Sequence, residues 1–246
     1  MNSIEFHKTA DFKLKNPIVV VGLPGTGLVG SVSASHLTET LGFSFGGYIS
    51  SDQFAPLAAI HNYVPMPAAR IHYSEKHNMV VILSEMTIPV ASSQELADKI
   101  LEFAKAVKAK YVVSLGGISM NEDENAVYVI SSDAKLSQSV IGKRGIKQIK
   151  EGATTGVSGV LLAKSALEKF PVISILAEAS ADYLDPHAAA NALGAFSLLT
   201  GVNISTVQLE KEAGELSKVI KENVLQSKVP VKKISNIKDE GGSMYG

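Results

Sequence analysis

Buried strands and amphipathic helices alternate along most of this chain. Ile18–Val21 is an uninterrupted β-branched run, which is typical of a strand buried on both faces of a parallel sheet. Tyr111–Leu115 and Pro171–Ala177 have the same apolar character. Between these segments, apolar residues recur at helical spacing in Ser92–Ala109 and Gly159–Lys169. The alternation predicts an α/β fold built on a mostly parallel sheet.

Shorter apolar segments predict further strands, at Phe43–Ser50, Ala69–Tyr73, Met79–Ser84 and Val127–Ile130. One helix separates the strand that ends at Ser84 from the strand that begins at Tyr111, and a crossover this short predicts that the two strands pair in parallel. The stretch between the second and third strands, Ser51–Ala69, contains three prolines. It is therefore predicted to be a long irregular loop of the kind that often carries binding residues.

Two helix starts are predicted from capping patterns. Ser92 and Glu95 have the spacing of a capping box, in which each side chain accepts a backbone N–H of the first turn. Asp185 followed by Pro186 predicts a second helix start, and Gly201 is expected to end that helix.

A glycine-rich loop follows the first buried strand and opens a helix. It reads Gly22-Leu-Pro-Gly-Thr-Gly27, and the hydroxyl of Thr26 is predicted to cap the helix. The spacing of Gly22 and Gly27 matches a phosphate-binding P-loop. However, Leu28 and Val29 stand where that motif needs a Lys and a Ser or Thr, so the sequence excludes a P-loop.

The same loop has the spacing of a dinucleotide-binding fingerprint. Gly25, Thr26, Gly27 and Gly30 fit the pattern GxGxxG, and Asp52 follows the next strand about where a ribose-binding acid stands. The chain between the strand and the first of these glycines is longer than the fingerprint allows. The alternative is that the small residues let the helix approach the sheet closely. Both interpretations remain open at the level of sequence.

Composition argues against several classes of function. Lys and Arg total 23 against 24 Asp and Glu, a formal net charge of −1, so no surface-wide attraction to nucleic acid or anionic membranes is expected. Cysteine is absent, which removes disulfides, thiol nucleophiles and cysteine-based metal sites. The N-terminus lacks the apolar core of a signal peptide, and no apolar run approaches the ~18 residues of a membrane span. A soluble cytoplasmic protein is expected.

No catalytic or metal-binding constellation stands out. The six histidines show no pair at metal-ligand spacing on a helix. Asp185 and His187 flank a proline, and the carboxylate is explained as a helix cap. The GxSxG pattern of a nucleophile elbow does not occur. We expect no catalytic residue, no metal and no cofactor.

The end of the chain differs in character from the rest. Ser205 and Gln208 have capping-box spacing for a last helix that is predicted to end near Gln226. The helical apolar stripe stops there, so we predict one α/β domain over residues 1–226 and a flexible tail over residues 227–246. A coil of this length reaches on the order of 25 Å. The chain ends in Met244-Tyr245-Gly246.

Four motifs together resemble the proteasome assembly chaperone family in its archaeal single-chain form. They are Val21–Ser31, Leu115–Ile118, Thr155–Leu162 and Asp185–Ala190. The resemblance covers about residues 15–226. It implies a three-layer α/β fold like that of nucleoside phosphorylases, used for protein binding rather than for a reaction, followed by C-terminal helices and the tail.

The resemblance also implies a partner and the residues that contact it. A hydrophobic residue, then Tyr, then any last residue resembles the motif by which proteasome activators dock between α subunits of the proteasome core particle. It implies Met244 as the hydrophobic anchor, Tyr245 as the aromatic anchor, and the carboxylate of Gly246 as the group that pairs with a pocket lysine. In archaeal relatives it implies a homo-oligomer, here a tetramer or pentamer, whose tails contact the α ring as an assembly chaperone or an ATP-independent activator.

Two alternatives remain open. One is a nucleotide-binding or small-molecule-binding enzyme that uses the Gly25–Gly30 loop. The other is a scaffold that binds a paralogous partner through its core and leaves the tail idle.

Overall fold

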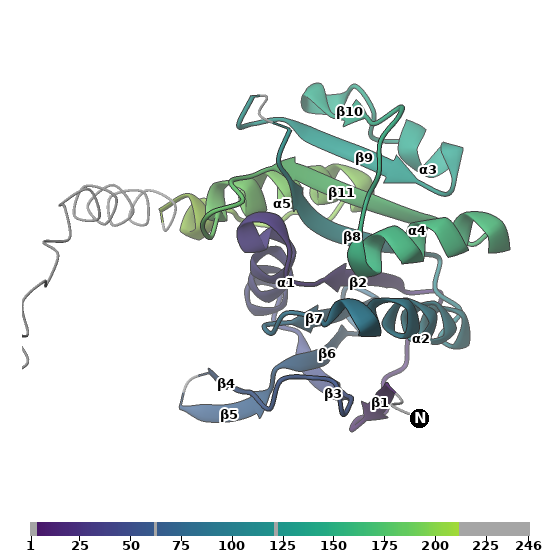
Figure 1. Cartoon of the computed structure of the whole chain (residues 1–246), viewed down its shortest axis with the longest axis vertical. Helices are drawn as coiled ribbons and strands as arrows, with labels where there is room; N and C mark the ends of the chain where they lie inside the picture. The colour runs from purple at the N-terminus through teal and green to yellow at the C-terminus, as the bar shows by residue number, and fades with distance from the viewer. Residues whose placement is uncertain (1–3, 62, 121–122, 212–246) are drawn as a thin grey trace, which may run out of the picture. The chain divides into compact units, whose positions relative to one another are not determined.

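The computed structural model describes residues 4–61, 63–120 and 123–211, all of which belong to one compact unit, Met1–Ala213 (Figure 1). Residues 207–211 are helical, at the start of the predicted last helix. The rest of that helix, the predicted boundary at residue 226 and the predicted tail lie outside the described residues.

A mixed sheet of nine strands with a parallel centre forms the core. The strand order is β1-β3-β6-β7-β2-β8-β11-β9-β10, and the four strands β7, β2, β8 and β11 run parallel to one another. Antiparallel strands flank this centre on both sides. The strands are β1 (Glu5–Lys8), β2 (Ile18–Gly22), β3 (Ser44–Ser50), β6 (Ala69–Ser74), β7 (Met79–Ser84), β8 (Tyr111–Ile118), β9 (Val127–Ser131), β10 (Lys147–Gln148) and β11 (Val172–Glu178).

The strands before and after helix α2 (Ser93–Ala106) are parallel, but they do not pair with each other. Strand β2 lies between them, with Val20 opposite Val81 of β7 on one side and Val113 of β8 on the other. The predicted direct pairing is therefore wrong, because a strand from the start of the chain occupies the position between β7 and β8.

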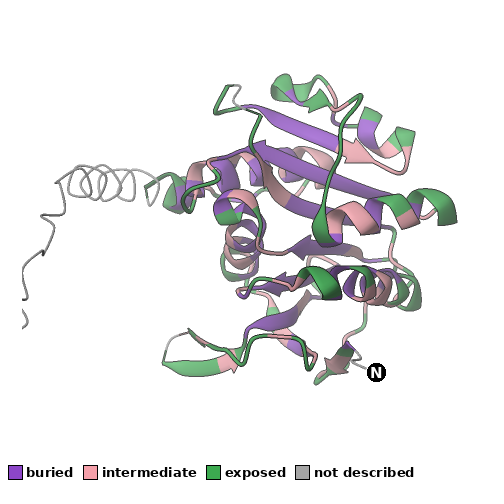
Figure 2. Cartoon of the chain, viewed as in Figure 1, coloured by how far each residue is buried: buried purple, intermediate pink, exposed green. Residues whose placement is uncertain are grey.

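Helices cover both faces of the sheet, which confirms the predicted three-layer α/β class. Helices α1 (Val29–Thr40) and α5 (Pro186–Thr200) pack on one face, whereas α2 and α4 (Gly156–Glu168) pack on the other. The short helix α3 (Ala134–Gln138) lies beside β9. Successive residues of a strand point to opposite faces, so Val20 faces α1 and Val19 faces α2. The central strands are consequently buried on both sides (Figure 2).

Small residues bring α1 against the sheet. A Cβ atom on Gly22 would lie 2.3 Å from the carbonyl oxygen of Gly30 and 2.4 Å from the Cβ of Ala34. A Cβ on Gly30 would lie 2.5 Å from the carbonyl oxygen of Leu23 and 2.6 Å from that of Leu115. Both distances are far inside van der Waals contact, so the packing requires glycine at both positions. The interpretation of these small residues as packing residues is confirmed.

Of the two side-chain caps predicted for the helices of this layer, the one at the start of α1 is wrong and the one at the start of α5 is confirmed. Thr26 lies in a 3-10 turn, Thr26–Leu28, and its side chain caps neither that turn nor α1, which is preceded by Leu28 in the left-handed conformation. In contrast, the Asp185 carboxylate accepts the N–H of Ala188 at 3.0 Å at the start of α5, and Gly201 ends that helix with φ of 75°.

The capping box predicted at the start of α2 is also wrong, because both of its side chains are used in tertiary contacts. The hydroxyl of Ser92 donates to the side-chain oxygen of Gln53 at 2.5 Å. The carboxylate of Glu95 accepts the backbone N–H of Ile4 at 2.7 Å. These two hydrogen bonds tie α2 to the segment after β3 and to the start of β1.

The segment predicted as an irregular loop contains a β-hairpin. Strands β4 (Ala58–His61) and β5 (Val64–Pro67) form a separate two-stranded sheet, drawn at the lower left of Figure 1. The prolines of β5 argued against a strand in the sequence. They are accommodated because an edge strand needs N–H donors on only one of its sides.

Two classes of feature do not occur within the described ranges. No helix there is long and apolar enough to cross a membrane. Nor do three His, Asp or Glu side chains gather there in a way that could hold a metal ion.

Candidate functional site

The glycine loop is packed between the end of β8 and the start of α5. Gly27 is buried with φ of 60°, a conformation that favours glycine, and its carbonyl oxygen accepts the N–H of Asp185 at 2.9 Å. On the other side, a Cβ on Gly117 would lie 2.2 Å from the carbonyl oxygen of Thr26. The loop therefore joins three segments of the chain through its backbone.

Two observations argue against a dinucleotide at this loop. Strand β3, which leads to Asp52, is separated from β2 by β6 and β7, and three strand spacings amount to about 14 Å. In the dinucleotide fold the ribose-binding acid follows the strand next to the loop. In addition, the Asp185 carboxylate stands beside Gly27, where it accepts the N–H of Ser180 at 3.3 Å. A phosphate placed here would meet a negative charge.

A cavity of about 510 Å³ opens next to the loop, at the ends of β8 and β11. Ile118 and Leu176 contribute apolar groups to its lining, and Thr26, Lys150 and Thr155 contribute polar groups. This volume is within the range of small-molecule sites. Of the four loop residues named from the sequence, only Thr26 lines the cavity. No pattern in the sequence pointed to Lys150, because the fold brings it there from a weakly patterned segment.

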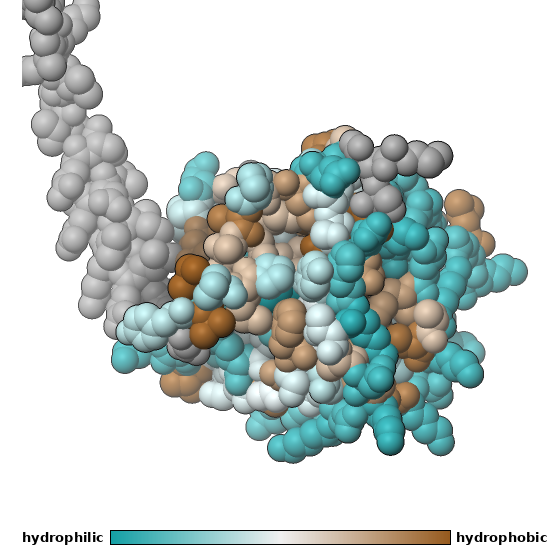
Figure 3. Space-filling model, turned by 90° about the horizontal axis from the view of Figure 1, so that it is seen from below, coloured by the Kyte–Doolittle hydropathy of each residue, from teal (hydrophilic) through white to brown (hydrophobic). Residues whose placement is uncertain are grey.

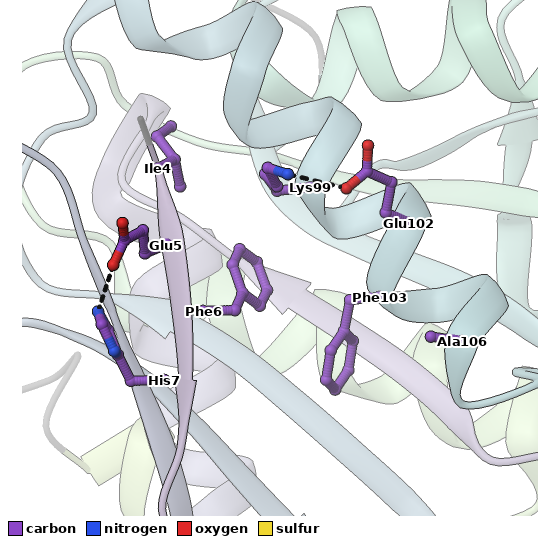
Figure 4. Close-up of a pocket in the computed structure, with 8 residues that line it drawn as sticks. All are labelled: Ile4, Glu5, Phe6, His7, Lys99, Glu102, Phe103 and Ala106. Atoms are coloured by element: carbon purple, nitrogen blue, oxygen red, sulfur yellow. Dashed lines mark hydrogen bonds and ion pairs between the residues drawn. The ribbon is translucent and has the colours of Figure 1, made fainter. Parts of the chain in front are cut away.

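A second concave region lies between β1 and α2 (Figure 4). The rings of Phe6 and Phe103 meet there with centroids 5.7 Å apart. The polar side chains around them have partners, since a carboxylate oxygen of Glu5 lies 3.5 Å from the His7 ring and Lys99 binds Glu102 on α2 at 3.0 Å. The region therefore combines an aromatic contact with polar side chains that have partners within the chain.

A half-buried charged cluster anchors the hairpin to the main sheet. Arg70 of β6 is 3% exposed and forms an ion pair with Glu85, which follows β7. His61 of β4 binds the same carboxylate at 2.8 Å, and an Nη of Arg70 donates to the carbonyl oxygen of Pro67 at 3.1 Å. Burial alone would raise the pKa of Glu85, but the hydrogen bonds and charges of Arg70 and His61 lower it overall. The cluster thus holds both hairpin strands through one carboxylate and one guanidinium.

His72 lies next to this cluster and is held in its neutral form. Both of its ring nitrogens are buried and have no hydrogen-bond partner among the described residues, and the ring packs edge-on against Phe45. Burial, together with the charges of Arg70 and His61, lowers the pKa of His72 from 6.5 to about 4, although Glu85 opposes the shift.

The low pKa of His72 predicts that the protein loses stability as the pH falls from 6.5 to 4. The unfolded chain binds a proton at this position near pH 6.5, whereas the folded chain does not until about pH 4, so protons favour unfolding within that window. The loss amounts to about 3 kcal/mol at pH 4. Urea unfolding at several pH values checks this. His72→Phe should flatten the dependence, because the substituted chain has no titrating group at this position. Equal slopes for wild type and His72→Phe would contradict the assignment.

The residues predicted to dock on a partner, Met244, Tyr245 and Gly246, lie outside the described residues. Among the features of the described part of the chain are the two concave regions above and the hairpin formed by β4 and β5. This is a three-layer α/β protein built on a mixed sheet with a parallel centre.

Comparisons with known proteins agree with this class. Residues 19–224 match the model of the PAC2 family, and the chain belongs to that family. It is 30% identical over 222 residues to the uncharacterized protein MJ0106 of Methanocaldococcus jannaschii, covering 90% of this chain and 91% of that one.

Two solved structures from Pyrococcus furiosus have the same fold. PbaA, described as an archaeal homolog of proteasome-assembly chaperone, is 27% identical with a TM-score of 0.81, over 92% of this chain and 93% of that one. PbaB, described as an archaeal proteasome activator, is 22% identical with a TM-score of 0.79, over 91% of this chain and 100% of that one. At its lower identity PbaB supports the fold alone.

Proposed function

We propose that this protein is a proteasome-binding factor, an assembly chaperone or an ATP-independent activator, which docks on the α ring of the core particle through its C-terminal tails. The observation that carries the proposal is the coincidence of two features. The chain ends in Met244-Tyr245-Gly246, and nearly its whole length resembles a homolog of proteasome-assembly chaperone. Neither feature depends on the other.

The energetics of docking require several tails. Burial of Met244 and Tyr245 contributes roughly 1.5–3 kcal/mol each, and a charge-assisted contact of the terminal carboxylate about 1.5–3 kcal/mol more. Ordering a loose segment and losing rigid-body freedom offset much of this. One tail therefore binds weakly, whereas several tails on one homo-oligomer raise the avidity by ~10²–10⁴.

Removal of the last three residues is expected to abolish binding to immobilised archaeal core particles in surface plasmon resonance. Tyr245→Ala should lose most of the binding, because the aromatic anchor supplies a large share of the buried area. Tyr183→Ala serves as the matched control, since this side chain is an exposed tyrosine outside the tail. Unchanged binding by the truncated protein would overturn the proposal and direct attention to the folded surface.

The enzyme alternative has less support. The loop residues Gly27 and Gly30 are used in packing, and the ribose-binding role assigned to Asp52 does not fit the strand order. The cavity beside Thr26 is the feature such a function would have to use.

A further inference from the structure

The hairpin carries an exposed apolar surface without charge. Gln53–Ala69 contains no Asp, Glu, Lys or Arg, in a chain of which 19% is charged. Leu57, Ile60, Tyr63 and Val64, here called the hairpin surface, are each more than half exposed, and Tyr63 is fully exposed. Seen from below the hairpin, pale and brown residues interrupt the hydrophilic surface at the side of the molecule that carries β4 and β5 (Figure 3). Depletion of charge around exposed apolar side chains is characteristic of the core of a protein interface.

The two edges of the hairpin differ in their ability to pair. The register places Ala59 opposite Met66 and Ile60 opposite Pro65. Proline has no N–H, so the pairs that exchange two hydrogen bonds must be Ala59 with Met66 and His61 with Val64. The backbone nitrogens of Pro65 and Pro67 then lie on the outer edge of β5. This edge has no N–H to donate at these two positions. Ala58 and Ile60 face the outer side of β4 with both their N–H and C=O groups.

We propose that β4 pairs with β4 of a second copy of this chain, antiparallel and about a two-fold axis, so that two hairpins form one four-stranded sheet. An isolated two-stranded hairpin is marginal in water, and additional strands stabilise it. Only β4 is available for this, because proline blocks the outer edge of β5 and the described residues place no strand beside β4.

The register follows from the hydrogen bonds. With the axis at Ala59, Ala58 of one copy faces Ile60 of the other, and each pair exchanges two hydrogen bonds, giving four in total. If the axis passed through Ala58 or Ile60 instead, the other of these two residues would not pair with Ala58 or Ile60 of the second copy. In the first register the Ile60 side chain of each copy also lies beside Ala58 of the other, on the exposed face.

A second copy fits this edge for two reasons. An unpaired charge is costly to bury, and self-pairing of an uncharged strand brings none into the contact. The pairing is also isologous, so this contact joins two copies instead of propagating, and of the two expected assemblies it fits a tetramer. The inference deepens the proposed function, because docking by several tails needs an oligomer. The anchoring of His61 and Pro67 by Glu85 and Arg70 holds the hairpin in one position for such a contact.

A single cysteine tests the register, since the chain has none of its own. Ala59→Cys places two thiols across the axis at Cα separations of about 4.5 Å, within disulfide range. Mild oxidation of dilute protein should convert it to a dimer of twice 26.0 kDa on non-reducing gels. Met66→Cys is the matched control, because it lies directly opposite Ala59 on the same face of the hairpin. Its two copies would be three strands apart, about 14 Å, and should not cross-link.

Equal cross-linking of the two cysteine variants, or none by Ala59→Cys, would overturn the proposal. A second measurement does not depend on a thiol. Ile60→Lys should lower the mass of the assembly in sedimentation equilibrium at least twofold, whereas Leu167→Lys, which changes an 84% exposed leucine on α4, should leave it unchanged. An unaltered mass in Ile60→Lys would also overturn it.

Failure of this inference can be told apart from failure of the proposed function. The protein lacking residues 244–246 should keep its assembly mass and lose proteasome binding. Ile60→Lys should lose assembly mass and bind core particles 10-fold or more weakly, because avidity is lost while each tail remains.

Discussion

Gly30→Ala is expected to lower the free energy of unfolding by about 3 kcal/mol or more. Its new Cβ would stand 2.5 and 2.6 Å from carbonyl oxygens of two different backbone segments, so no side-chain rotation can relieve the overlap. Helix α1 would have to move away from β2 and β8, which opens the layer that contains Val29 and Leu37. For a domain of this size the loss corresponds to a fall in Tm of about 6–12 °C or more, measurable by calorimetry.

Gly25→Ala is the control from the same loop. No atom lies within 4 Å of a Cβ placed there, and the backbone is extended. We expect a change in unfolding free energy within about ±0.5 kcal/mol. Similar destabilisation by both substitutions would mean that the loop is sensitive as a whole and that close packing at Gly30 is not the reason for its glycine.

Glu85→Gln is expected to destabilise the protein by about 3 kcal/mol, because it leaves the guanidinium of Arg70 buried without its counter-charge. The hairpin should loosen at the same time, since its anchor through His61 is weakened. Urea unfolding measures the first effect, and hydrogen exchange of residues 58–67 measures the second.

Two further variants qualify this result. Glu168→Gln breaks the ion pair between Glu168 of α4, whose side chain is 43% exposed, and Lys105 of α2, whose side chain is 47% exposed. It should lower the free energy of unfolding by less than about 1 kcal/mol. The double variant Arg70→Met with Glu85→Gln should recover much of the loss, because the buried charge is gone. A double variant less stable than Glu85→Gln would show that Arg70 stabilises the fold through packing rather than through its charge.

Most of the core could be predicted from the chain because its signal is local. The β-branched run that predicts β2 lies within that strand, and the capping residues and apolar spacing that predict α5 lie within or next to that helix. The structure confirms both elements. Strand order is different, since it depends on which surfaces meet after the elements form. Nothing near Tyr111 in the sequence indicates that β2 separates β8 from β7. The same holds for Ser92 and Glu95, whose capping potential was outweighed by tertiary partners.

The candidate sites were predictable to different degrees. The glycine loop was visible as a pattern, but only its contacts with Leu115 and Asp185 separate packing from ligand binding. The hairpin was missed because Pro65 and Pro67 are poor strand residues in general and acceptable only at an edge. The cluster of Arg70, Glu85 and His61 joins three segments, and no spacing rule links them. The docking role of Met244, Tyr245 and Gly246 stays a prediction.

The central position of β2 has a consequence for synthesis of the protein. Its residues leave the ribosome before either of the strands that it pairs with, and about 60 residues separate it from β7. At a synthesis rate of ~5–20 residues per second, roughly 3–12 s pass between the synthesis of the apolar strand β2 and that of its first partner, β7. The interval before its second partner, β8, is longer. Until β8 follows, one edge of β2 stays unpaired even after β7 has formed. The nascent chain is therefore most vulnerable to aggregation early, long before its C-terminus exists.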